Sequence, residues 1–156
     1  MTIILPIPAR RVSPNACRGQ SKFAAFKKSR LVKLHRTRAR LLTLEAIGKL
    51  YHAQDRPVPA FTGYSLAHFF ATAAWRDDDN ADGACKAYRD GIADALGLDD
   101  RKLPKLALST RGKDAEWPRV EITLHTLSSS PLPPVPFRDS HAGGSGTPLS
   151  IPTHTP

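Results

Sequence analysis

The stretch that decides the fold is WRDDDNADGACKAYRDGIADALGLDD, residues 75–100. Within it, the apolar residues of segment 81–96 share one side of a helix drawn at about 100° per residue, and Gly97 is a typical helix stop. Just upstream, residues 64–76 alternate with a period of two in a β-branched and aromatic context, which predicts a strand. Both faces of this strand are apolar, so we expect it in the centre of a sheet, with His68 packed inside the protein.

The flanking segments predict the rest of the domain. Residues 2–5 form a short β-branched run, and the prolines that follow make residues 6–20 a rigid basic loop. Residues 21–53 hold no proline and a single glycine, which favours a long helix. Between residues 27 and 40 the cations point in several directions around the expected helix, so we expect this part of the helix to project from the body of the domain. The end expected to pack contains Leu41, Leu44, Ile47 and Tyr51.

The C-terminal segments complete a compact fold. Residues 103–110 and 119–127 are interpreted as a closing hairpin joined by a polar turn. The predicted order is therefore strand, helix, strand, helix, strand, strand (β-α-β-α-β-β), a single α/β (α+β) domain with a mixed sheet over residues 1–127. Residues 128–156 are rich in Pro, Ser and Gly, and we expect a disordered tail.

Charge is divided unevenly along the chain, whose formal net charge is +9. Residues 1–50 hold twelve Lys and Arg but a single acid, Glu45, whereas residues 76–127 hold nine bases and eleven acids. A basic region of this kind binds phosphates by displacing condensed counterions, although it is also typical of a solvated helix. No apolar run is long enough to cross a bilayer, so we expect no membrane partner and a cytoplasmic location.

The acidic groups offer ligands for a metal. Asp77 and Asp79 project to the same side of an extended chain, and paired carboxylates are oxygen ligands of the type that Mg²⁺ prefers. Asp and Asn also commonly cap a helix N-terminus, which is the alternative here. A second acidic pair, Asp99 and Asp100, follows the helix.

The combination of DxDN, an apolar-striped helix and DD resembles the core of the RusA family of Holliday junction resolvases, including its phage-type members. The opening LPIPARRVSPNACR, residues 5–18, also resembles that family's short strand and Pro-rich loop with an Asn. The resemblance implies a homodimeric, Mg²⁺-dependent endodeoxyribonuclease that nicks a four-way DNA junction in recombination and repair.

Carried over by position, the family's catalytic and metal-binding acids fall on Asp77, Asp79 and Asp100. The archetypal resolvase has a lysine where this sequence has Gly83, and Lys86 occupies a lysine position common in phage-type members. Lys86 is therefore the candidate catalytic cation. The alternative is that it only makes helix-surface ion pairs with the acids four residues to either side.

The basic loop and the first helix are expected to bind the DNA arms, and Arg76 to contact DNA rather than to catalyse. The predicted DNA-binding residues are Arg10, Arg11, Asn15, Arg18, Lys22, Lys27, Lys28, Arg30, Lys33 and Arg76.

Distance restricts how the acidic groups can meet. A helix of 16 residues is about 24 Å long, so a single straight helix cannot bring Asp100 to Asp79. Either residues 97–102 fold back, or Asp100 reaches the acidic pair of a second subunit related by a two-fold axis. We predict that the second route contributes.

A competing hypothesis is a non-catalytic basic DNA-binding or phage regulatory protein whose aspartates only cap a helix. A third possibility keeps the nuclease but gives it flaps or other branched DNA as substrate.

Overall fold

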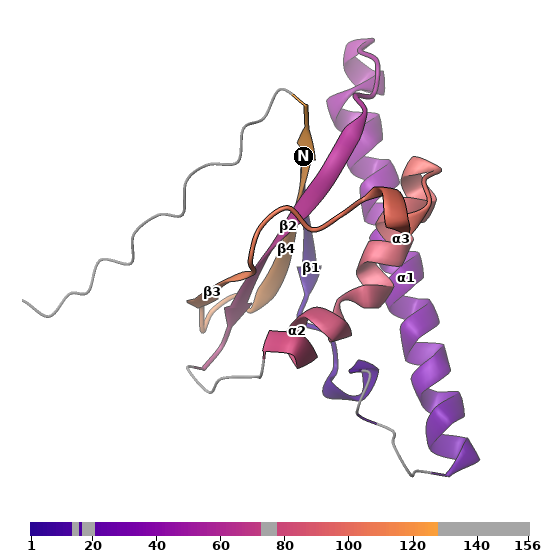
Figure 1. The fold of residues 1–156 in the computed structure, drawn as a ribbon, viewed down its shortest axis with the longest axis vertical. Helices are drawn as coiled ribbons and strands as arrows, with labels where there is room; N and C mark the ends of the chain where they lie inside the picture. Colours follow the sequence, from indigo (N-terminus) through magenta and orange to yellow (C-terminus); the bar gives the residue numbers. More distant parts are fainter. Residues whose placement is uncertain (14–15, 17–20, 73–77, 128–156) are drawn as a thin grey trace, which may run out of the picture.

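The computed structural model describes residues 1–13, 16, 21–72 and 78–127. The expected α+β class with a mixed sheet is confirmed, and two helices form where the sequence predicted a single second helix (Figure 1). The tail predicted for 128–156 lies outside the described residues. The strands are β1 (Thr2–Pro6), β2 (Phe61–Phe70), β3 (Thr110–Lys113) and β4 (Arg119–Thr126), and the helices are α1 (Lys22–Leu50), α2 (Asp78–Ala84) and α3 (Lys86–Leu96). Short 3₁₀ helices are η1 (Arg10–Val12), η3 (His52–Gln54) and η4 (Asp100–Lys102).

The four strands form one mixed sheet in the order β1-β4-β2-β3. β4 runs antiparallel to both β1 and β2, whereas β3 runs parallel to β2. The central position of β2 is thus confirmed, and so is the packing of His68, which is 1% exposed.

The predicted closing hairpin is wrong, because β2 lies between β3 and β4. β4 carries Val120, Ile122 and Leu124, all fully buried, and this apolar face belongs in the sheet interior. β3 is the polar four-residue segment TRGK, which suits an edge. It begins only at Thr110, and residues 103–109 reach the sheet as a loop with one bridge from Lys105 to Tyr64.

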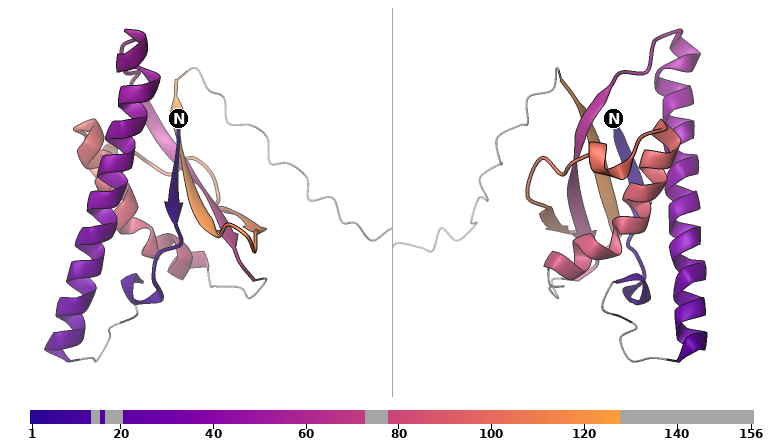
Figure 2. Two further views of the ribbon diagram at one scale, coloured as in Figure 1. Left: turned by 180° about the vertical axis from the view of Figure 1, so that it is seen from behind. Right: turned by 45° about the vertical axis from the view of Figure 1, so that its right-hand side comes forward.

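The helices cover one face of the sheet, as Figure 2 shows. Tyr88 and Ile92 of α3 are fully buried and belong to the same apolar core as Leu5, Leu66 and Ile122 of the sheet. The segment 81–96 is not one helix. It bends at the fully buried Cys85, where 3₁₀-type hydrogen bonds interrupt the α-helical pattern.

Helix α1 packs on α3 through small and polar side chains. Its buried positions are His35, Ala39, Thr43 and Ile47, spaced by four residues. The ring of His35 meets that of Tyr88 edge to face, with centroids 5.0 Å apart. Close packing is possible because Gly91 of α3 lies against α1, where an added Cβ would be 2.1 Å from the Arg36 carbonyl oxygen.

Two expectations for α1 need correction. Leu41 and Leu44 do not pack, being 60% and 42% exposed, because α3 approaches along the stripe of smaller residues. The stretch 27–40 does not project as a whole, since His35 and Ala39 are buried in it. In addition, Arg36 forms a bidentate pair with Asp94 of α3, at 2.6 and 2.7 Å.

Candidate active site

Three segments that are distant in the sequence meet at one end of the molecule. The backbone oxygen of Ser13 accepts a hydrogen bond from Lys28 Nζ of α1 at 2.8 Å, and Ser13 Oγ donates to Asn80 Oδ1 of α2 at 3.1 Å. Figures 1 and 2 show η1 between the N-terminal part of α1 and α2. Asn80, the Asn of the DxDN motif, is thus joined to the basic N-terminal segment.

Several predicted site residues lie outside the described part of the chain: Asn15, Arg18, Arg76 and Asp77. For Asp79 the structure describes the backbone only, as the second residue of α2. Within the described residues, no group of three or more His, Cys, Asp or Glu side chains is arranged to hold a metal ion.

The chain folds back after α3 and places Asp100 beside Lys86. Gly97 adopts the left-handed conformation, with φ of 65°, and ends the helix. Asp99 then caps η4 by accepting a hydrogen bond from Arg101 N at 3.0 Å. The next carboxylate, that of Asp100, lies 3.5 Å from Lys86 Nζ. The return of residues 97–102 therefore brings Asp100 to Lys86 at the start of α3. That Asp100 reaches the Asp77/Asp79 pair of a second subunit stays a prediction, because Asp77 and the Asp79 side chain lie outside the described part of the chain.

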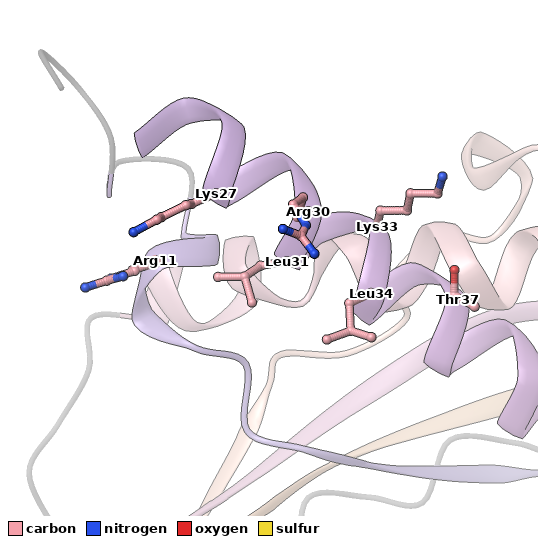
Figure 3. A pocket seen from close by; sticks show the side chains of 7 residues that line it. All are labelled: Arg11, Lys27, Arg30, Leu31, Lys33, Leu34 and Thr37. Atoms are coloured by element: carbon pink, nitrogen blue, oxygen red, sulfur yellow. The ribbon is translucent and has the colours of Figure 1, made fainter. Parts of the chain in front are cut away.

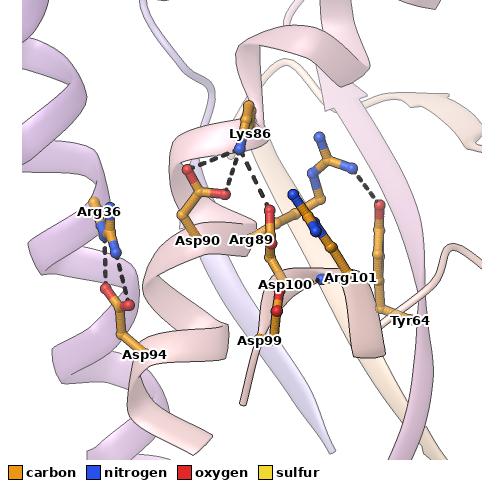
Figure 4. A network of polar contacts seen from close by, with 9 residues as sticks. All are labelled: Arg36, Tyr64, Lys86, Arg89, Asp90, Asp94, Asp99, Asp100 and Arg101. Carbon is orange, nitrogen blue, oxygen red and sulfur yellow. Dashed lines mark hydrogen bonds and ion pairs between the residues drawn. The ribbon is translucent and has the colours of Figure 1, made fainter. Parts of the chain in front are cut away.

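Lys86 joins two carboxylates (Figure 4). Its ammonium group donates to both oxygens of Asp90, at 2.8 and 3.1 Å, in addition to the ion pair with Asp100. The ion pair with Asp90 is the i,i+4 contact that the sequence suggests as the alternative role of Lys86. Among the described residues Lys86 pairs with Asp90 and Asp100 rather than with Asp82, whose carboxylate contacts His68, Ser109 and Lys105 instead.

Asp100 is suited to act as an anionic ligand. Its pKa is lowered by a hydrogen bond with the Asp99 side chain and further by the neighbouring Lys86 charge. Its side chain is 49% exposed, so the carboxylate is accessible from solvent. Asp100 therefore presents an ionised oxygen donor at neutral pH.

A small hollow of about 130 Å³ opens next to this ion pair. Arg89 extends across it and donates from Nη1 to Tyr64 Oη of β2 at 2.6 Å, as Figure 4 shows. The hollow thus combines two cations with two carboxylates. Its lining residues are Tyr64, Lys86, Arg89, Asp90, Asp100 and Leu103.

A polar cluster that the sequence did not predict surrounds Asp82. Its carboxylate accepts hydrogen bonds from His68 Nε2 at 2.9 Å and from Ser109 Oγ at 2.7 Å, and it pairs with Lys105. Burial raises the pKa of Asp82, but the bonds from Lys105, Ser109 and His68 outweigh burial, so the net pKa is lowered. The cluster ties α2 to the sheet and to the loop before β3. The sequence feature that could have predicted this cluster was Asp82 itself, a charged residue three positions after Asp79 in a segment predicted to be helical.

A wide cationic groove runs along the first half of α1. It has a volume of about 710 Å³, and Figure 3 shows Arg11 of η1 beside the helix residues that line it. Four of the predicted DNA-binding residues meet here: Arg11, Lys27, Arg30 and Lys33. The remaining lining residues are Leu31, Leu34 and Thr37, so no acid lines the groove. Arg10 and Lys22 are exposed outside it, and Lys28 turns toward Ser13.

Comparison with known proteins gives no family for the chain. No protein-family model matches it, and no solved structure matches it. An uncharacterized protein of Xylella fastidiosa is similar, with 34% identity over 101 residues. The match covers 65% of this chain and 61% of that protein, so the chain spans about three-fifths of the relative's length. This similarity assigns no activity, and any function has to be argued from the site.

In the part of the chain that the structure describes, no helix is both long and apolar enough to cross a membrane.

Proposed function

We propose that this protein is a RusA-like, Mg²⁺-dependent endonuclease that resolves four-way DNA junctions by paired nicking. The observation that carries the proposal is the double contact of Ser13, with Lys28 of the basic helix and with Asn80 of the DxDN motif. DNA bound along the cationic groove would therefore lie at the same end of the molecule as the acidic motif.

The donor chemistry fits Mg²⁺. Asp77, Asp79 and Asp100 supply carboxylate oxygens, the ligands that this cation prefers, and Asp100 is ionised and accessible. These three residues would hold the ion. When bound, Mg²⁺ polarises the scissile phosphate and lowers the pKa of a bound water.

The cations of the chain have separate tasks in this proposal. Lys86 contacts Asp90 and Asp100, so it orients Asp100 and limits the repulsion between the two carboxylates. Arg11, Lys27 and Arg30 neutralise DNA phosphates, which gives affinity without sequence specificity. Paired nicking of a two-fold symmetric junction requires two sites, and a homodimer supplies them.

The proposal is tested with a synthetic four-way junction, one strand labelled at a time, with and without Mg²⁺. We expect Asp79→Asn and Asp100→Asn to retain junction binding and to lose cleavage. Asp55→Asn is the matched control, since it removes one exposed carboxylate elsewhere and Asn accepts the left-handed conformation, φ 51°, of that position. Tight binding by the wild type without Mg²⁺-dependent cleavage would instead favour a non-catalytic DNA-binding protein.

A further inference from the structure

Two phenylalanines near the start of α1 are largely exposed to solvent. Phe23 is 64% exposed and Phe26 is 61% exposed. They are three residues apart on one helix, so their Cβ atoms are neighbours on its surface, about 5 to 6 Å apart. The third large exposed aromatic side chain in the described residues is Trp117, which lies in the turn between β3 and β4 rather than on α1.

The two rings belong to the same helix face as the cationic groove. Phe26, Arg30 and Leu34 follow one another at intervals of four, and Arg30 and Leu34 line the groove. Lys27 Nζ lies 4.3 Å from the centroid of the Phe23 ring, which brings a groove cation onto one of the aromatic faces. Aromatic rings and cations are therefore interleaved on one surface.

From this arrangement we infer that Phe23 and Phe26 form a stacking site for unpaired nucleotide bases, with the groove cations holding the phosphates of the same strand. Aromatic faces accept any base by stacking, and a cationic groove follows the backbone. A fully paired duplex keeps its bases stacked on each other, so the site selects unpaired nucleotides such as those at a branch point. The inference deepens the proposed function and rests only on its nucleic-acid-binding half.

Charge favours this occupant over two others. A second copy of the chain would bring the same cations against Arg11, Lys27 and Arg30, and like charges repel. A helix that binds a membrane separates its apolar and charged faces, whereas here Lys27 and Arg30 stand between the phenylalanines and Leu34. A single strand of nucleic acid offers unpaired bases to stack on the rings and phosphates to pair with the cations.

The test measures binding alone, in metal-free buffer with EDTA, by fluorescence anisotropy. The probes are a 20-nucleotide single strand and a duplex of the same length. We expect Phe23→Ala/Phe26→Ala to weaken single-strand binding by about fivefold or more and to change duplex binding less than twofold. Arg30→Ala should weaken both, because it removes a phosphate contact.

Leu41→Ala is the matched control, because Leu41 is 60% exposed on the same helix but lies beyond Thr37, the last helix residue that lines the groove. We expect it to leave single-strand binding unchanged, and circular dichroism to show all variants folded. A second readout is Phe26→Trp, whose fluorescence should be quenched by the single strand and not by the duplex.

Three results would overturn the inference. The first is an equal loss on single strand and duplex in the double variant. The second is a shift from dimer to monomer in both the double variant and Leu41→Ala, which would make the face a contact between copies. The third is loss of binding to phosphatidylserine vesicles with single-strand affinity intact. Cleavage is a separate readout: a double variant that binds single strands normally but still nicks junctions refutes only the stacking site.

Discussion

The contact between α1 and α3 gives the sharpest prediction about the fold. Gly91→Ala would place a Cβ 2.1 Å from the Arg36 carbonyl oxygen, so the two helices would have to separate by more than 1 Å to reach ordinary contact. Overpacking of this kind costs about 1 to 3 kcal/mol, and we take the upper end because the obstacle is backbone. Replacing Gly by Ala inside a helix returns about 1 kcal/mol. The net expectation is a loss of about 2 kcal/mol in the free energy of unfolding.

The chain offers a matched control in α1. At Gly48 an added Cβ meets nothing within 4 Å, so Gly48→Ala should stabilise the protein by up to about 1 kcal/mol through helix propensity alone. Urea unfolding followed by circular dichroism measures both variants. The same Gly→Ala substitution is expected to lower the free energy of unfolding in α3 and to raise it in α1. If Gly91→Ala were as stable as Gly48→Ala, the close packing of α3 on α1 would be refuted.

Four further outcomes follow from the polar groups. Asp82→Asn should cost about 2 kcal/mol in urea unfolding, because it weakens charged hydrogen bonds that include one to the buried His68. Burial holds the pKa of His68 below its ordinary 6.5, so the contribution of neutral His68 to stability is present above pH 6.5 and is lost as the pH falls through the lowered pKa. The loss of unfolding free energy at low pH should therefore be smaller in His68→Gln than in the wild type. An identical pH dependence in the two proteins would contradict this role of His68. In EDTA, Asp79→Asn should bind junction DNA at least as tightly as the wild type, since it removes a negative charge near the phosphates. Weaker binding by this variant would count against Asp79 lying near the bound phosphates. Mixing Asp79→Asn with Asp100→Asn should restore some cleavage if subunits share a site, and no recovery despite demonstrated subunit exchange would exclude sharing.

The sequence predicted those features that depend on local pattern. Apolar residues on both faces of 64–76 predicted a strand in the sheet interior, and β2 occupies that position, although it runs from Phe61 to Phe70. The spacing of Lys86 and Asp90 predicted their ion pair. The buried stripe of α1 was not predictable by hydrophobicity, because Ala39 and Thr43 rank below the exposed Leu41 as core residues. They are buried because they allow α3 to approach closely.

The sequence did not predict the strand pairings and side-chain contacts that join segments far apart in the chain. Adjacent strands commonly form hairpins, but here the edge of β2 was open to a parallel partner and the apolar face of β4 required an interior position. The cluster around Asp82 unites α2, β2 and the loop before β3, and no local spacing connects those three segments. The return of Asp100 to Lys86 likewise depends on the turn at Gly97 rather than on the helix pattern.

We propose that the basic end of the molecule presents branched DNA to the aspartates of the DxDN and DD motifs. The most direct test of this proposal compares the rate of nicking of a four-way junction in Mg²⁺ by the wild type, Asp100→Asn and Asp55→Asn at saturating protein. We expect symmetric nicks on opposite strands for the wild type and Asp55→Asn, and no nicks for Asp100→Asn when it is bound equally well. A wild type that binds the junction and leaves every strand intact in Mg²⁺ would contradict the proposal.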